Sequence, residues 1–222
     1  MKKAELLTMT QHESKFIPAL SLKVLTPFYD TLFKWTMREE LFKGRLIEQA
    51  KIRSGQRVLD LGCRTGTLTI MVKQAHPDSE VIGLDGDPQV LEIALQKAKQ
   101  AGSPITFDEG MAYQLPYPDA SFDRVLSSMV FHHLTNQDKE RSLVEIYRVL
   151  KPDGELHLAD FGVPHGFYAK IISFLMRRFE RVDDNVNGRI LQMFVKTKFS
   201  VAKTAEFLTV FGTLALLRGT KS

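Results

Sequence analysis

The segment "VLDLGCRTG", residues 58–66, has the composition of a loop that binds a nucleotide-like ligand. Gly62 and Gly66 follow a short apolar run, where the absence of side chains lets a backbone approach a ligand closely. A helix after the loop would offer unpaired N–H groups to the same ligand. An NAD-binding loop carries glycine at its first, third and sixth positions, but the third and sixth are Arg64 and Thr67 here. The glycine spacing therefore favours a nucleotide-like ligand other than NAD.

Acidic residues end the first two predicted strands. Asp85 follows "VIGL" and lies 19 residues beyond Gly66, which is the place of an acid that accepts hydrogen bonds from ribose hydroxyls. Asp60 ends "VLD" and either orders the glycine loop or receives an ammonium group. Asp87 is better explained as a helix N-cap, because Pro88 follows it at the first helical position.

Histidines supply the candidate general bases. His132 and His133 end the fourth predicted strand in "SSMVFHHL", and His165 follows the fifth in "GVPHGF". Adjacent residues of a strand point to opposite faces, so the two neighbouring histidines are not expected to share a metal ion, and no metal site is predicted. His132 and His165 are the catalytic candidates. The alternative for each is a structural histidine that binds backbone groups or packs under the next helix.

Strand and helix patterns alternate from residue 56 to residue 161, and these elements must position the candidate residues. Strands are predicted over residues 57–62, 80–85, 104–110, 122–131 and 155–162. Helices are predicted over residues 67–76, 87–102 and 136–150, the last one stopped by the turn sequence "KPDG". Strands separated by helices form a mainly parallel sheet covered on both faces, and ligands bind at its carboxyl edge.

The two flanks differ from this alternating core. Residues 1–54 have a helical pattern, whereas the alternating segment 199–219 predicts an antiparallel hairpin at the sheet edge. A helical stretch at about residues 165–181 has an apolar stripe and basic residues elsewhere. It fits either a core-packed helix or a cap over a lipophilic acceptor. No repeat or low-complexity linker interrupts the chain, so one domain is predicted over residues 1–222.

Composition narrows the function classes. The 222 residues, 44% of them hydrophobic and 25% charged, are typical of a soluble globular domain. Cys63 is the sole cysteine, which excludes an internal disulfide framework and favours the reducing cytoplasm. No apolar run reaches the roughly 20 residues of a transmembrane helix, and the first residues lack the apolar stretch of a signal peptide. A net charge of +4 is too small to indicate a nucleic-acid partner.

Four segments occur in order and at the spacing typical of one family: "VLDLGCRTGTLT", "VIGLDGDPQVLEIA", "FDEGMAYQLPYPDASFDRVLSSMVFHHL" and "RVLKPDGELHLADFG". Over about residues 58–162 the chain resembles the class I S-adenosylmethionine-dependent methyltransferases, nearest the ubiquinone/menaquinone-biosynthesis and small-molecule group. The resemblance implies an α/β, Rossmann-like, doubly wound fold with a mainly parallel seven-stranded sheet whose last strand is reversed. It also implies a helical N-terminal lid (1–54), a cofactor-binding core (55–162), and cap helices followed by the terminal hairpin (163–222).

The resemblance assigns individual residues to S-adenosylmethionine, the cofactor that it implies. The implied binding residues are Asp60, Gly62 and Gly66 for the methionine part, with Cys63 in the same loop, Asp85 for the ribose, Gly86, Met111 and Ala112 for the adenine, Ser127 after the fourth strand, and Tyr29 in the lid. The strand-four exit "SSMVF" lacks the Asn/Asp-Pro-Pro-aromatic turn with which related enzymes grip the amines of nucleic acids or proteins. Nucleic acid is therefore disfavoured as the substrate.

Two residues depart from the family pattern. Arg64 stands where the family has the middle glycine of the loop, and Met111 replaces an acid that faces the adenine. If the backbone at Arg64 has a positive φ, a side chain there costs about 1 kcal/mol or more. Its guanidinium would either point to solvent or meet the carboxylate of the cofactor, and the sequence leaves both alternatives open.

The sequence thus predicts a cytoplasmic methyltransferase that acts on a small, lipophilic or aromatic acceptor, with peripheral membrane contact allowed. The alternative is a homologue that binds the cofactor but is catalytically impaired by Arg64 and Met111. A nicotinamide-dependent dehydrogenase is disfavoured by the loop spacing.

Overall fold

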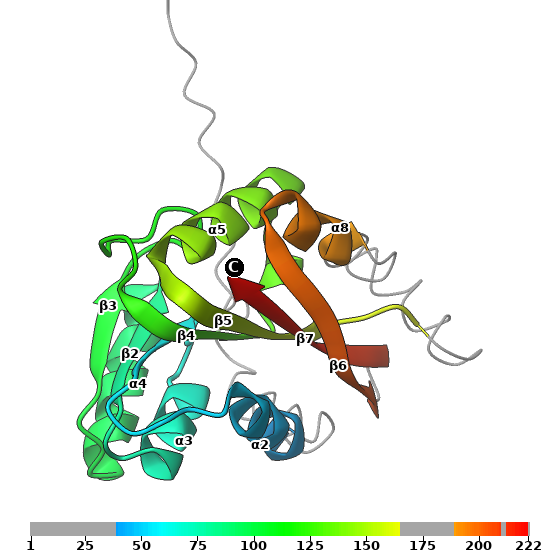
Figure 1. Cartoon of the computed structure of the whole chain (residues 1–222). Coiled ribbons are helices and arrows are strands. Elements are labelled where there is room, and N and C mark those ends of the chain that lie inside the picture. Colours follow the sequence, from blue (N-terminus) through cyan, green and yellow to red (C-terminus); the bar gives the residue numbers. More distant parts are fainter. Residues whose placement is uncertain (1–38, 165–188, 210–211, 222) are drawn as a thin grey trace, which may run out of the picture.

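Seven strands form one sheet in the computed structural model, in the order β3-β2-β1-β4-β5-β7-β6 (Figure 1). The structure describes residues 39–164, 189–209 and 212–221. The strands are β1 (Arg57–Leu61), β2 (Glu80–Asp85), β3 (Thr106–Glu109), β4 (Phe122–Ser128), β5 (Leu150–Phe161), β6 (Phe199–Thr209) and β7 (Gly212–Lys221). Within the described ranges the helices are α2 (Glu39–Ala50), α3 (Thr67–Ala75), α4 (Pro88–Gln100), α5 (Asn136–Val149) and α8 (Arg189–Lys196), with a 3₁₀ turn, η1 (Phe131–His133).

The sheet is parallel except at one strand. Strands β1 to β5 pair in parallel, whereas β7 runs antiparallel to both β5 and β6. The predicted seven-stranded, mainly parallel sheet with a reversed last strand and a terminal hairpin is therefore confirmed. Because the parallel strands share one direction, the loops after β1, β2, β3, β4 and β5 lie at the same edge of the sheet.

Both faces of the sheet are covered by helices (Figure 1). Helices α5 and α8 lie on one face, and α2 and α3 lie on the other. Side chains alternate along β1: Leu59 packs in the cluster that contains Ile146 of α5, and Val58 packs in the cluster that contains Leu46 of α2. By the same alternation Asp60 lies on the α2–α3 face.

Local signals explain why α4 begins where it does. The Asp87 side chain accepts a hydrogen bond from the N–H of Gln89 at 2.9 Å, and Pro88 occupies the first helical position. The helix is followed by Gly102 with a φ of +60°, the left-handed conformation that ends helices. The interpretation of Asp87 as a helix cap agrees with this geometry.

Two strand boundaries differ from the prediction by three residues or more. Strand β5 begins at Leu150 and includes the predicted turn "KPDG", because Leu150 pairs with Phe122 and both side chains are fully buried. The pairing register then shifts between Phe122 and Arg124. Strand β4 ends at Ser128, three residues early, because Met129 adopts a φ of +58° and the chain turns into η1.

Several predicted features lie outside the described residues. They are Tyr29, the part of the lid before residue 39, the helical stretch 165–181, and His165. Within the described part of the chain, no helix is long and apolar enough to span a membrane.

Candidate cofactor and acceptor site

The loop between β1 and α3 depends on its glycines for its own packing. Gly62 and Gly66 have φ values of +71° and +74°. A Cβ on Gly62 would lie 2.4 Å from Cγ2 of Val130, and a Cβ on Gly66 would lie 2.9 Å from Cβ of Ala94. The loop is therefore pressed against the chain that follows β4 on one side and against α4 on the other.

Replacing Gly66 by alanine should lower the free energy of unfolding by about 2 kcal/mol, since positive φ strain adds to the contact with α4. Gly55→Ala is the matched control, because Gly55 has a φ of +77° but nothing within 4 Å of its Cβ position. The control should cost about 1 kcal/mol, from the backbone alone. Urea denaturation of the two variants measures the difference in their free energies of unfolding. Equal losses of stability would show that the loop can move to accommodate the added Cβ.

Asp60 is buried at the tip of β1, with 1% of its surface exposed. The hydroxyl of Thr69 on α3 donates a hydrogen bond to Asp60 Oδ2 at 2.6 Å. Burial raises the pKa of Asp60 to about 6, although this hydrogen bond and the positive charge of Lys43 on α2 act in the opposite direction. A carboxylate held in this state is suited to receive a further cation, such as an ammonium group.

Asp60→Asn should stabilise the free protein at pH 8 by about 1–2 kcal/mol. The folded pKa lies above the ordinary value of 3.8, so the stability that Asp60 contributes is present below pH 3.8 and lost as the pH rises through 6. Asparagine keeps an oxygen that can accept the Thr69 hydroxyl, and its side chain does not ionise as the pH rises. Urea unfolding should show a larger gain at pH 8 than at pH 4.5. A gain in stability that does not depend on pH would contradict the raised pKa of Asp60. An equal gain in Asp153→Asn, at an exposed site, would contradict it as well.

Asp85 joins the glycine loop to the start of α4. Its Oδ2 accepts the N–H of Arg64 at 2.8 Å, and its Oδ1 accepts the N–H of Asp87 at 3.1 Å. Burial raises the pKa of Asp85, and these two N–H groups and the Arg64 charge offset part of that effect. Each carboxylate oxygen has two acceptor sites, so Asp85 retains capacity for ribose hydroxyls.

The predicted adenine residues follow β3 at the same edge. The N–H of Gly110 donates to the backbone oxygen of Asp85 at 3.0 Å, which brings the start of this segment beside the end of β2. Gly86, Met111 and Ala112 are all partly exposed. These three residues are therefore accessible to a ligand beside Asp85.

Two other predicted contact residues are buried. Ser127 has no exposed surface, and its hydroxyl donates to the backbone oxygen of Leu61 at 3.0 Å. Cys63 is 6% exposed, and burial raises the pKa of its thiol far above the ordinary range. Ser127 therefore ties β4 to β1, and Cys63 is an unreactive thiol in the loop. Their roles toward a cofactor stay predictions.

Arg64 has the positive backbone φ that makes a side chain costly there, at +51°. Its side chain is exposed, and its charge acts on both Asp85 and His133. The helix that follows, α3, has no side-chain cap at Gly66, so its first N–H groups are available to an anionic group such as a carboxylate. The glycine loop, the uncapped helix and Asp85 together fit the carboxylate and ribose of S-adenosylmethionine.

His132 is bound to Asp160 at the end of β5. His132 Nδ1 lies 2.9 Å from Asp160 Oδ1, and the two side chains are 3% and 4% exposed. Asp160 also accepts the backbone N–H groups of His132 at 3.3 Å and Phe161 at 2.7 Å. Burial acts to raise the pKa of Asp160, but the His132 ring and these donors lower it below its ordinary value.

The expectation that His132 and His133 point apart on a strand is wrong. Both residues lie in the 3₁₀ turn η1, and their ring centroids are 3.9 Å apart. The left-handed turn at Met129 takes the chain out of the strand before it reaches them. Among the described residues, no cluster of three or more His, Cys, Asp or Glu side chains is arranged to hold a metal ion.

A small pocket of about 80 Å³, lined mainly by apolar side chains, lies beside Asp160. Asp160 and Phe161 of β5 line it together with Ile190 of α8, with Ala215 and Leu217 of β7, and with the charged Lys203 and Glu206 of β6. Asp160 is not among the site residues predicted from the sequence. The signal was available, because an acid at the carboxyl end of a parallel strand reaches the same edge as Asp60 and Asp85.

A family model described as a methyltransferase domain matches residues 58–154, which include the loop, Asp85 and η1. This segment of the chain is therefore similar to a methyltransferase domain. The demethylmenaquinone methyltransferase of Thermus thermophilus is 38% identical over 123 residues, which are 55% of this chain and 55% of the relative. The enzyme of that name from Deinococcus radiodurans is 42% identical over 116 residues, covering 52% of this chain and 47% of the relative. The chain thus spans about half the length of these curated relatives.

Solved structures share the fold of the chain. The YcgJ protein of Bacillus subtilis has a TM-score of 0.67 at 21% identity, covering 81% of this chain and 97% of that one. The S-adenosylmethionine-dependent methyltransferase SibL has a TM-score of 0.68 at 20% identity, covering 92% and 60%. The [4+2]-cyclase SpnF has a TM-score of 0.66 at 17% identity, covering 81% and 79%. The resemblance to class I methyltransferases is confirmed, and the cyclase shows that the fold alone does not specify the reaction.

Proposed function

We propose that the chain binds S-adenosylmethionine at the carboxyl edge of its sheet and transfers the methyl group to a small lipophilic or aromatic acceptor. The observation that carries this proposal is the bond between the Arg64 N–H and Asp85, which joins the glycine loop to the predicted ribose-binding residue inside the segment that matches a methyltransferase domain. When bound, the cofactor supplies an electrophilic methyl group on its sulfonium.

The residues of the chain bind and orient the reactants. Asp85 would accept hydrogen bonds from the ribose, and the first N–H groups of α3 would bind the cofactor's carboxylate. Asp60 would receive its ammonium group. We further propose that His132, held by Asp160, accepts a proton from the acceptor during transfer, as a carboxylate-oriented imidazole can do. His165 and Tyr29 stay predictions, because both lie outside the described residues.

The acceptor class rests on two kinds of support. The relatives' names specify demethylmenaquinone as the molecule methylated, and the pocket beside Asp160 is lined mainly by apolar side chains. We therefore propose a lipophilic ring with an ionisable hydroxyl as the acceptor, reached in the cytoplasm and with peripheral membrane contact. Nucleic acid stays disfavoured.

A second candidate is a homologue that binds the cofactor without turning it over. The positive φ of Arg64 and its exposed cation favour this alternative, because both act at the loop that would hold a positively charged sulfonium. Release of S-adenosylhomocysteine from S-adenosylmethionine, with a short-chain demethylmenaquinol as the acceptor, separates the two. Product release supports the methyltransferase, binding of both ligands without product supports the impaired homologue, and absence of binding contradicts both.

Arg64→Gly should tighten S-adenosylmethionine binding by about 1 kcal/mol or more, roughly fivefold, through relief of backbone strain and of charge repulsion. The backbone N–H that donates to Asp85 persists in the variant, so the loop keeps its anchor. Titration calorimetry with S-adenosylmethionine and S-adenosylhomocysteine separates the two causes. Repulsion predicts a larger gain for the sulfonium, whereas strain predicts equal gains.

The matched control is Lys198→Gly, at a positive φ of +66° after α8. It should relieve backbone strain without changing affinity for either ligand. Weaker binding of either ligand by the Arg64 variant would show that the guanidinium pairs with the cofactor's carboxylate.

A further inference from the structure

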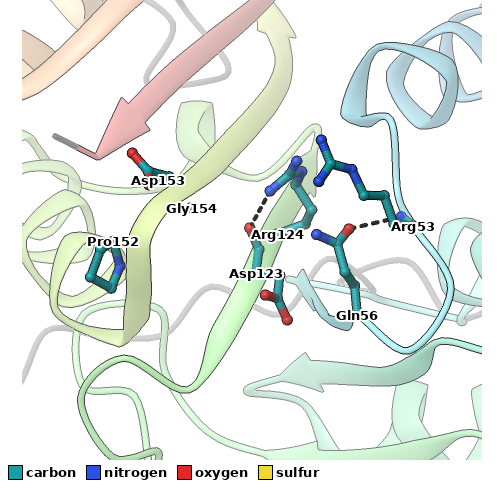
Figure 2. Close-up of a pocket in the computed structure, with 7 residues that line it drawn as sticks. All are labelled: Arg53, Gln56, Asp123, Arg124, Pro152, Asp153 and Gly154. Carbon is teal, nitrogen blue, oxygen red and sulfur yellow. Dashed lines mark hydrogen bonds between the residues drawn. The ribbon is translucent and has the colours of Figure 1, made fainter.

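A second pocket, of about 250 Å³, lies at the opposite edge of the sheet (Figure 2). Three segments form its walls: the chain between α2 and β1, the start of β4, and the turn at the start of β5. The lining residues are Arg53, Gln56, Asp123, Arg124, Pro152, Asp153 and Gly154. Because β4 and β5 begin here and end at the cofactor edge, this pocket is separate from the site described above.

Arg53 contributes a guanidinium that has no ion-pair partner within the described ranges 39–164, 189–209 and 212–221. Its backbone is fixed, because the Arg53 N–H donates to Gln56 Oε1 at 2.8 Å and the Arg53 oxygen accepts the N–H of Gln56 at 3.2 Å. Figure 2 shows its side chain extending toward Arg124 rather than away from the pocket. The hydrogen-bonded turn thus fixes the backbone from which this exposed side chain extends.

Arg124 contributes a second guanidinium, which is rigid. Its side chain is 11% exposed. Nε donates to the backbone oxygen of Ala50 at 2.8 Å, and Nη1 donates to the backbone oxygen of Asp123 at 2.8 Å (Figure 2). Nη2 forms no hydrogen bond with the described residues, which leaves one pair of N–H donors for a ligand.

The neighbouring carboxylates are shared with other basic groups or lie across the pocket. Asp123 accepts Lys151 Nζ at 2.8 Å and the N–H of Arg57 at 2.9 Å. Glu155 forms an ion pair with Arg124 Nε at 3.5 Å, and it shares its carboxylate with His157 at 3.2 Å and Arg218 at 3.9 Å. Asp153 is exposed and lies on the side of the pocket away from the two arginines (Figure 2).

The geometry points to a binding site for a phosphate group between Arg53 and Arg124. Two guanidinium groups that approach one space repel each other unless an anion lies between them, and the guanidinium fork matches the oxygens of a phosphate. The volume leaves room for a small polar body beyond the phosphate, whose hydroxyls Asp153 can accept. The ligand class is a phosphate monoester or the phosphate of a lipid headgroup.

Inorganic phosphate is the probe for the test, followed by ³¹P line broadening and by titration calorimetry on the full chain. Wild type should bind it, and Arg53→Gln should weaken binding by about tenfold or more, the scale of a charge-assisted hydrogen bond. Arg53→Lys should weaken it less. Arg45→Gln, on the exposed surface of α2, is the matched control and should leave binding unchanged. A thermal melt verifies that each variant is folded.

Vesicles of phosphatidylcholine with and without phosphatidylglycerol distinguish the two sources of phosphate. Arg53-dependent flotation with the anionic vesicles identifies a headgroup site, whereas phosphate binding without flotation identifies a site for a free phosphate monoester. The proposal is overturned if wild type binds neither phosphate nor vesicles, if Arg53→Gln binds as wild type does, or if S-adenosylhomocysteine displaces the phosphate.

Discussion

Asp160→Leu is expected to lower the free energy of unfolding by about 3–5 kcal/mol, the usual cost of removing one partner from a buried, hydrogen-bonded pair. The His132 ring N–H, the His132 backbone N–H and the Phe161 backbone N–H all donate to this carboxylate. Leucine has a similar volume but no acceptor, so all three donors would be left buried without their partner. The change also uncouples the turn after β4 from the end of β5.

Urea denaturation measures the loss, and two further variants identify its cause. Asp160→Asn keeps an oxygen for part of the donor set and should lose less than the leucine variant. His132→Leu combined with Asp160→Leu should recover stability relative to Asp160→Leu alone, because the side-chain donor is gone. No recovery in the double variant would show that the ring and the carboxylate are not coupled.

The stabilisation from Asp160 should depend on pH. Its pKa is lowered in the folded state, so its contribution is present above the ordinary pKa of 3.8 and is lost as the pH falls through the lower folded value. The stability gap between wild type and Asp160→Leu should therefore narrow on acidification. If His132 also acts as the base, folded Asp160→Asn should bind cofactor normally and turn over at least about 100-fold more slowly. Unchanged turnover in Asp160→Asn would show that the contact between His132 and Asp160 is only structural.

Asp85→Ala is expected to weaken S-adenosylmethionine binding by about 1.5–3 kcal/mol, or roughly 10- to 150-fold, since it removes a charged acceptor for the ribose. The variant also removes the acceptor for the Arg64 N–H, so part of the loss would come from the glycine loop. Asp85→Asn separates the two contributions, because an amide oxygen can keep the loop bond while the charge is lost.

The control for Asp85 is Asp87→Ala, two residues away. Asp87 caps α4, so its loss should lower stability by about 1 kcal/mol and leave affinity nearly unchanged. Calorimetric titration of the three folded variants checks the order. Wild-type affinity in Asp85→Ala would remove the ribose assignment.

Patterns that repeat along the chain predicted the fold well. The alternation of strands and helices indicated the parallel sheet, and Asp87 with Pro88 indicated the start of α4. Gly62 and Gly66 indicated a loop at the carboxyl edge, but the sequence suggested that the backbone must approach a ligand there. The structure adds a second physical reason, because a Cβ at Gly62 would collide with Val130 and one at Gly66 with Ala94 of the protein itself.

Contacts between distant residues could not be read from local patterns. His132 and Asp160 are 28 residues apart and meet only because β4 and β5 are neighbours and η1 turns back over them. The bond from the Arg64 N–H to Asp85 likewise joins two loops. In the pocket proposed to bind phosphate, Arg53 precedes β1 and Arg124 lies near the start of β4. The pairing of β1 with β4 brings the two residues together, and neither belongs to a sequence motif.

Titration calorimetry of the wild-type chain with S-adenosylmethionine, S-adenosylhomocysteine and NAD tests the central claim most directly. The site geometry predicts that both sulfur-containing ligands bind, one per chain, and that NAD gives no binding heat. Binding of NAD, or absence of binding by both S-adenosylmethionine and S-adenosylhomocysteine, would contradict the assignment of the carboxyl edge as their site.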